Sequence, residues 1–359
     1  MKAKTSRGLC AAAAPILCAL LTLASQCLRA QETKEKVTVD DVDRNFMVRL
    51  PRGYDPKQQY PVVILLHGMN QDPDDMERLT RFDELADKNG IIAIYPSALH
   101  GRWNVGVRPQ ERQTGMMRPG GGHRRYGGGY PGGGGGGYPG GRGQQGPGQQ
   151  PDAERRPTPA DDIAFFHQML DQVSSKFSPD SSRVYVVGLS EGGFMSLRVA
   201  CSLSDRVAAV ASVGAAMPKT MICLPSRPVP VLMVNGTSDP VVPYGGGTEH
   251  NLSLSTLSAE DSSKDWGKID HCNDKPEKGK WISKAKGATE TKTDTYEGCL
   301  QNAQVELYSL KGAGNTWPGG EQYEAENTVG KTSQDVNGNE IVWNFLSNRK
   351  LPQKSARAR

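Results

Sequence analysis

The feature that most constrains the fold of this chain is a Gly-Leu-Ser-Glu-Gly run at residues 188–192. It lies between a strand pattern at 183–187 and a helix pattern at 192–202. In this context, the run predicts a tight strand-to-helix turn that holds a serine in a strained conformation, with its hydroxyl exposed above a sheet. The glycines at both ends allow neighbouring backbone to pack against the turn. The run therefore predicts Ser190 as a nucleophile.

Buried strands and helices alternate along the rest of the chain. Continuous apolar runs are typical of strands buried on both faces of a mostly parallel sheet, and such patterns occur at 61–66, 91–95, 207–213 and 230–235. A further strand is expected at 305–310. Helical spacing occurs at 81–89, 161–177 and 336–348, and edge strands are expected within 37–49. This order predicts a single α/β domain with a doubly wound sheet.

The first thirty residues predict a secretory signal peptide. Lys2, Lys4 and Arg7 precede an apolar run at 9–24, and a small residue, Ala30, marks the expected cleavage site. A membrane anchor is the alternative, but the run is shorter than the ~20 apolar residues that a spanning helix needs. We expect a secreted, extracellular or periplasmic protein without a stable membrane anchor.

The charge of the chain points away from polyanionic partners once the leader is removed. The whole chain has 43 basic and 39 acidic residues, and the leader carries four basic residues and no acidic ones. The mature chain therefore has no net charge, which gives no reason to expect binding to nucleic acid or to a membrane surface. A short basic tail at 350–359 is expected to be solvated.

Four cysteines remain outside the leader: Cys201, Cys223, Cys272 and Cys299. An even number in an exported chain suggests two disulfides, for which three connectivities exist. We favour pairing between neighbours in the sequence. Zinc ligation is the alternative, but no C-x-x-C or closely paired histidines accompany these cysteines. We expect no metal and no other cofactor.

One stretch interrupts the pattern of strands and helices. Residues 115–148 hold 18 of the 42 glycines of the chain, interspersed with tyrosine, proline and glutamine. Such a segment buries too little apolar surface to offset the entropy lost on ordering. We expect a disordered loop insertion over 108–158 within a domain spanning 31–349. It is interpreted as a solvated spacer or as a tether whose tyrosines stack on cell-wall sugars.

Two further turns fit the chemistry of an exposed serine. In α/β-hydrolases, an amide from the loop after the first buried strand joins the amide that follows the nucleophile to form an oxyanion hole. The donors here would be the N–H groups of Met69 and Glu191, with His67 shaping the turn. Asp239 follows a later strand, in the order expected of a catalytic acid. Ordinary turns are the alternative for both segments.

Four segments together resemble the polyhydroxybutyrate depolymerase/feruloyl esterase family of extracellular esterases. They are Gly-Leu-Ser-Glu-Gly-Gly-Phe at 188–194, His-Gly-Met-Asn-Gln at 67–71, Asn-Gly-Thr-Ser-Asp-Pro-Val-Val-Pro-Tyr at 235–244 and Gly-Ala-Gly-Asn-Thr-Trp-Pro-Gly-Gly at 312–320. The resemblance implies a single α/β-hydrolase domain that cleaves esters through an acyl-enzyme on Ser190, with Asp239 as the acid. It implies ester substrates, including polyesters and plant cell-wall polysaccharide esters, and it favours the two local disulfides.

The chain departs from this family at one position. The last motif of the family carries the histidine that acts as general base, and here that position is Asn315. Asparagine cannot take the serine proton, which leaves Ser190 a weak nucleophile. In a well-studied protease, loss of the base lowers turnover about a million-fold. His100 and His250 are the candidates for a substitute base. The rival function is a catalytically silent protein that binds a polysaccharide or polyester.

Two tryptophans lie on loops at the expected catalytic edge of the sheet. Trp103 and Trp317 are candidate substrate-binding residues, because aromatic side chains there can form the wall of an ester or sugar pocket. The alternative is that both rings cover the core.

Overall fold

The computed structural model describes residues 31–106, 160–249, 254–283 and 289–352. The expected signal peptide, the glycine-rich insertion, most of the basic tail and His250 lie outside these ranges.

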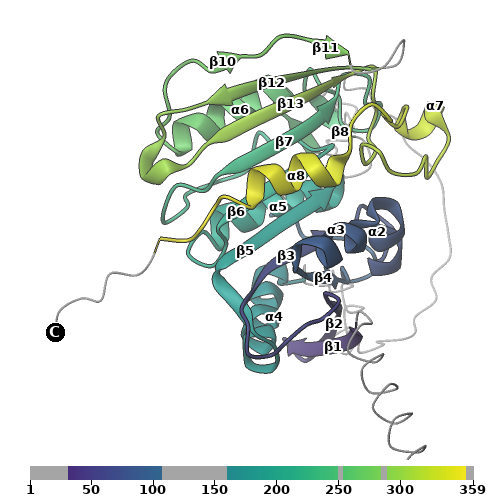
Figure 1. Cartoon of the computed structure of the whole chain (residues 1–359). Coiled ribbons are helices and arrows are strands. Elements are labelled where there is room, and N and C mark those ends of the chain that lie inside the picture. Colours follow the sequence, from purple (N-terminus) through teal and green to yellow (C-terminus); the bar gives the residue numbers. More distant parts are fainter. Residues whose placement is uncertain (1–30, 107–159, 250–253, 284–288, 353–359) are drawn as a thin grey trace, which may run out of the picture. The chain divides into compact units, whose positions relative to one another are not determined.

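An 11-stranded sheet organises the described residues (Figure 1). Its strand order is β1-β2-β4-β3-β5-β6-β7-β13-β12-β10, with β11 also paired to β12. The six central strands are parallel: β4 (Ile92–Pro96), β3 (Tyr60–Leu66), β5 (Pro179–Leu189), β6 (Ala209–Val213), β7 (Val231–Gly236) and β13 (Val305–Lys311). Antiparallel strands complete both edges: β1 (Gln31–Val39), β2 (Val42–Leu50), β12 (Glu290–Tyr296), β10 (Glu277–Lys278) and β11 (Ile282–Ser283).

Helices cover both faces of this sheet. On one face, Val62 and Ile64 of β3 pack with residues of α4 (Asp162–Lys176), α5 (Glu191–Ser202) and α6 (Ala259–Ile269). On the other face, Val63 and Leu65 pack with residues of α2 (Pro73–Thr80), α3 (Phe82–Asn89) and α8 (Gly338–Leu346). Every residue of β3 is therefore buried, which explains its continuous apolar run. Within the described ranges, no helix has the length and apolarity needed to cross a membrane.

The predicted doubly wound α/β domain is confirmed, with element ends shifted by a few residues. Gly90 ends α3 in the left-handed conformation, at φ 62°. The sequence did not predict α2, α6 or β12. The residues of β12, Glu-Thr-Lys-Thr-Asp-Thr-Tyr, are mostly polar because this strand lies near an edge of the sheet. A small separate sheet pairs β8 (Gly247–Glu249) with β9 (Leu254–Thr256), and α7 covers Glu326–Val329.

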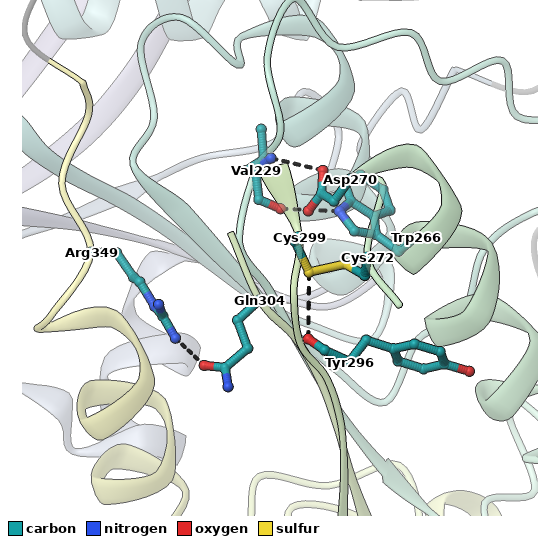
Figure 2. The surroundings of a disulfide bond; sticks show 8 residues. All are labelled: Val229, Trp266, Asp270, Cys272, Tyr296, Cys299, Gln304 and Arg349. Atoms are coloured by element: carbon teal, nitrogen blue, oxygen red, sulfur yellow. Dashed lines mark hydrogen bonds between the residues drawn. A yellow bond between two sulfur atoms is a disulfide. The ribbon is translucent and has the colours of Figure 1, made fainter. Parts of the chain in front are cut away.

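The structure contains both local disulfides, Cys201–Cys223 and Cys272–Cys299. The second follows α6 closely, at a point where this helix is bonded to the chain entering β7 (Figure 2). There the Asp270 carboxylate accepts the Val229 amide at 3.0 Å, and the Trp266 indole donates to the Val229 carbonyl at 3.1 Å.

Candidate active site

Ser190 forms the turn between β5 and α5 that the sequence predicts. Its backbone is strained, with φ 55° and ψ −116°, and its amide donates to the carbonyl of Val213 at 2.8 Å. The two flanking glycines are required by packing. A Cβ on Gly192 would lie 2.2 Å from the carbonyl oxygen of Leu66, and one on Gly188 would lie 1.9 Å from the carbonyl oxygen of Gly192. The turn is thus wedged against the end of β3, and its serine remains partly exposed.

Asn315, on the loop after β13, is fully buried and joins two other strand ends. Its Nδ2 donates to the Gly214 carbonyl at 2.8 Å and to Oδ2 of Asp239 at 2.7 Å. Val213, the last residue of β6, accepts the backbone amide of Ser190, and the next residue, Gly214, accepts the side chain of Asn315. The structure therefore brings Ser190, Asp239 and Asn315 to one edge of the sheet.

Asp239 is a buried carboxyl whose other oxygen accepts the amides of Val241 and Val242, both at 2.8 Å. Burial raises the pKa of Asp239 to about 7, although the hydrogen bonds from Val242, Asn315 and Val241 lower it in part. In a triad with histidine, a neighbouring imidazolium would favour the ionised carboxylate. The neutral amide of Asn315 provides only a hydrogen bond.

The turn after β3 presents the first of the two proposed oxyanion donors. The amide of Met69 has no acceptor in the described part of the chain, whereas the Gly68 amide is bonded to Oε1 of Gln71 at 2.8 Å. His67 is buried and lies between the Gly68 carbonyl, 2.7 Å from Nδ1, and the Ala98 amide, 3.1 Å from Nε2. These bonds place a proton on Nδ1, and burial lowers the pKa of His67. His67 therefore shapes the turn as a neutral side chain.

Glu191 carries the second proposed donor and has an ion pair that the sequence did not reveal. Its carboxylate is 1 % exposed and accepts Nε of Arg102 at 3.0 Å. Burial raises the pKa of Glu191, and the hydrogen bond from Arg102 opposes that shift. Arg102 lies on the loop after β4, with no motif or spacing to connect it with the serine turn.

Glu249, on β8, is a second residue that the sequence did not identify. Its side chain is buried, and its negative charge adds to the rise in the pKa of both Asp239 and Glu191. Glu249 therefore opposes ionisation of both Asp239 and Glu191. No sequence signal separates Glu249 from the other acidic residues of the chain.

The remaining candidates lie elsewhere. Trp103 and Trp317 are only 4 % and 2 % exposed, so their rings lie mostly in the core. Trp317 also lines a hollow formed by residues of α3 and α8, and neither Ser190 nor Asp239 lines that hollow. The Trp103 indole donates to the His67 carbonyl at 2.9 Å, and the Trp317 indole donates to Oδ1 of Asn339 at 3.0 Å.

His100 is exposed at a left-handed turn, φ 54°, and no hydrogen bond joins it to Ser190 or Asp239 in the described structure. His250 falls outside the described ranges. Within those ranges, no group of three or more His, Cys, Asp or Glu side chains is placed to hold a metal ion.

Comparisons with known proteins agree with this architecture. The Phospholipase/Carboxylesterase family model matches residues 150–281, and a second model, of an esterase family, matches residues 40–107. Feruloyl esterase B of Piromyces equi is 30% identical over 165 residues, which cover 44% of this chain and 29% of that protein. NocK of Nocardia uniformis subsp. tsuyamanensis, which is named as an esterase, is 23% identical over 296 residues, 80% of this chain and 74% of NocK.

A third relative is the bifunctional acetylxylan esterase/xylanase XynS20E of Neocallimastix patriciarum, 24% identical over 202 residues. The chain spans 22% of XynS20E, so it corresponds to a minor part of both XynS20E and feruloyl esterase B. The residues that the Phospholipase/Carboxylesterase model matches include the serine turn. Over the segments that the two family models match, the chain is therefore similar to carboxylesterases and feruloyl esterases.

Proposed function

We propose that this protein hydrolyses carboxylic esters through an acyl-enzyme on Ser190, with a turnover that Asn315 keeps low. The observation that carries the proposal is the strained serine turn, held beside an Asp239–Asn315 hydrogen bond of 2.7 Å. In this proposal, the three residues correspond to a catalytic triad in which an amide has replaced the imidazole.

In the proposed reaction, Oγ of Ser190 attacks the ester carbonyl carbon and the alcohol departs, leaving an acyl-serine that water then hydrolyses. Negative charge develops on the carbonyl oxygen, where the amides of Met69 and Glu191 and the amino end of α5 would stabilise it. The serine proton must pass to the leaving alcohol. Asn315 can hold a hydrogen bond during this transfer but cannot bind the proton, so the step lacks a general base.

The relatives suggest the class of substrate. Feruloyl esterase B and the acetylxylan esterase/xylanase are named for esters of plant cell-wall material. We propose an ester borne on a cell-wall polysaccharide, with a polyester as the alternative polymer. A secreted protein would meet such a substrate, and the two disulfides are consistent with export.

A silent binding protein is the second candidate. It is favoured by the complete burial of Asn315, whose side chain makes two hydrogen bonds and whose backbone is bonded to Val329 and Tyr323. The fold thus holds the N–H groups of the amide and its backbone in fixed contacts, as expected if catalysis is no longer required.

Activity measurements with methyl ferulate and an aryl acetate separate these candidates. We expect the wild type to hydrolyse these esters slowly and Ser190→Ala to abolish this hydrolysis. In Asn315→His, the rate of hydrolysis should rise about 10²–10⁴-fold, the range that a general base contributes. Asn327→His, an exposed change in α7, is the matched control and should gain nothing.

Each other outcome is also informative. Wild-type activity equal to that of Ser190→Ala, together with a gain in Asn315→His, identifies a silenced esterase. Fast, Ser190-dependent hydrolysis by the wild type identifies a substitute base and contradicts the role given to Asn315. A folded Asn315→His variant without Ser190-dependent hydrolysis refutes the acyl-enzyme proposal.

A further inference from the structure

The loop at residues 98–104, here called the bridging loop, is bonded to the turn that carries Met69. The Ala98 amide is 3.1 Å from Nε2 of His67, and the indole of Trp103 donates to the His67 carbonyl at 2.9 Å. The Asn70 amide donates to the Gly101 carbonyl at 2.9 Å. Gly101 approaches so closely, at φ +68°, that a Cβ there would lie 3.2 Å from the Cα of Asn70.

The same loop is bonded to the serine turn on its other side. Nε of Arg102 lies 3.0 Å from Oε1 of Glu191, the residue directly after Ser190. The guanidinium is 43% exposed, whereas the carboxylate is buried and its second oxygen has no hydrogen-bond partner in the described structure. Burial of a carboxylate is costly unless it is paired. Arg102 contributes most to holding the Glu191 carboxylate in its ionised form, and the backbone of Trp103, on the same loop, adds a smaller contribution.

We infer that the bridging loop sets the separation between the amides of Met69 and Glu191, with Arg102 as the positioning residue that fixes the second of them. The inference rests on the proposed function, because it assigns these amides to the oxyanion. Without Arg102, the Glu191 side chain must take up a proton or turn toward water. Either change shifts the first residue of α5 and therefore the direction of its N–H group.

A displaced donor affects the transition state more than substrate binding. Removing one oxyanion donor lowers kcat by about 10²–10³-fold in a well-studied protease, and a misdirected donor should cost a part of that. The expected signature is a loss in kcat with little change in KM. Affinity for a tetrahedral boronate adduct on Ser190 should fall in parallel with kcat, because the adduct places an oxygen in the same position.

The kinetic experiment uses Asn315→His as the active background. We expect Arg102→Met to lower kcat about 10–100-fold, to leave KM within about 3-fold and to weaken inhibition by phenylboronic acid to the same extent as kcat. Arg102→Lys should recover part of the loss. Arg206→Met is the matched control, since Arg206 pairs with Asp171 at 2.7 Å on α4 and should leave all three quantities unchanged.

A second measurement needs no catalysis and therefore separates this inference from the proposed function. Hydrogen exchange of the peptide covering residues 67–71 should accelerate in Arg102→Met, because the Asn70 amide is bonded to the bridging loop, and it should not accelerate in Arg206→Met. If exchange is unchanged, the loop does not hold the turn and the inference fails, whatever the activity. If exchange accelerates while kcat and boronate affinity stay constant, the loop does not position the oxyanion donors. If exchange accelerates in Arg102→Met but even Asn315→His hydrolyses no ester, the proposed function fails, whereas the contact of the bridging loop with the turn is upheld.

Discussion

Asn315 shows how one side chain changes the expected chemistry while the fold stays intact. Its N–H group bonds to Asp239 as an imidazole N–H would, and a second bond to Gly214 fixes the side chain. Its carbonyl oxygen, in contrast, is buried without a hydrogen-bond partner in the described structure. A buried unpaired polar atom costs about 1–3 kcal/mol. The amide therefore lies in a polar site that it satisfies only in part.

Packing at the serine turn leads to a stability prediction. Gly192→Ala would place a methyl group 2.2 Å from a backbone oxygen of β3, which cannot move aside as a flexible side chain would. We expect the free energy of unfolding to fall by about 1–3 kcal/mol, the usual cost of overpacking, as measured by urea denaturation. Gly245→Ala is the matched control, because no atom lies within 4 Å of its added Cβ. Equal stability of the two variants would contradict the tight packing of the turn.

At the scale of elements, a buried polar cluster joins the chain before the glycine-rich insertion to the chain after it. The side chains of Arg44 and Asp162 form an ion pair of 2.5 Å with 3 % and 0 % exposure. The backbone N–H of Asn104 donates to the Asp162 carboxylate at 2.6 Å, and its side-chain Nδ2 donates to the Ala160 carbonyl at 2.8 Å. The loop after β4 and the start of α4 are thus held together by the domain itself.

We therefore predict that the insertion can be excised. Replacing residues 108–158 with a Gly-Ser linker of about six residues should retain the fold and raise the free energy of unfolding by up to about 2 kcal/mol, since a shorter loop loses less entropy on closure.

In the full-length or the excised chain, Asp162→Asn should lower the free energy of unfolding by about 3–5 kcal/mol, because it leaves the buried Arg44 unpaired. Thermal and urea unfolding measure both effects. An excised chain that fails to fold would show that the insertion is part of the domain.

Over the whole molecule, buried carboxyls make stability depend on pH. Burial raises the pKa of Asp270 to about 7, and the same cause raises that of Asp239 to about 7. In the unfolded chain such groups release their protons near pH 4. The contribution of these two carboxyls to the free energy of unfolding is therefore fully present below about pH 4 and is lost as the pH rises toward 7. Above about pH 7, the two groups cause little further change in stability.

Asp270→Asn tests this dependence, because its amide oxygen can still accept the Val229 amide but the side chain cannot ionise. Each pKa unit corresponds to about 1.4 kcal/mol, so the wild type should lose roughly 2–4 kcal/mol more than the variant between pH 4 and pH 8. Urea unfolding across this range measures the difference. Asp171→Asn, at a carboxylate that is 69% exposed, should follow the wild-type curve. Parallel curves for all three proteins would show that Asp270 does not titrate as its burial implies.

The elements that the sequence predicted are those with a strong local signal. Apolar runs identified the central strands because both faces of the sheet are covered, and the glycines at 188 and 192 identified the serine turn because only glycine fits there. The polar strand β12 has no apolar run and was not predicted. Helix α6 was also not predicted, because it has few apolar side chains besides Ala259, Trp266 and Ile269. Trp103 and Trp317 were proposed as substrate-binding residues from their place in loops; both rings are buried, and the role stays a prediction.

By itself, the sequence determined the alternation of buried strands and helices in the centre of the domain, the serine turn and the absence of histidine at position 315. Each of these depends on residue type and local spacing. Only the tertiary structure decided that Asn315 bonds to Asp239, that Arg102 pairs with Glu191 and that Glu249 is buried near them. The reason is physical: these contacts join residues that are distant in the chain, and the hydrogen bonds, pairing and burial that shift their pKa values arise only when the sheet brings its strand ends together.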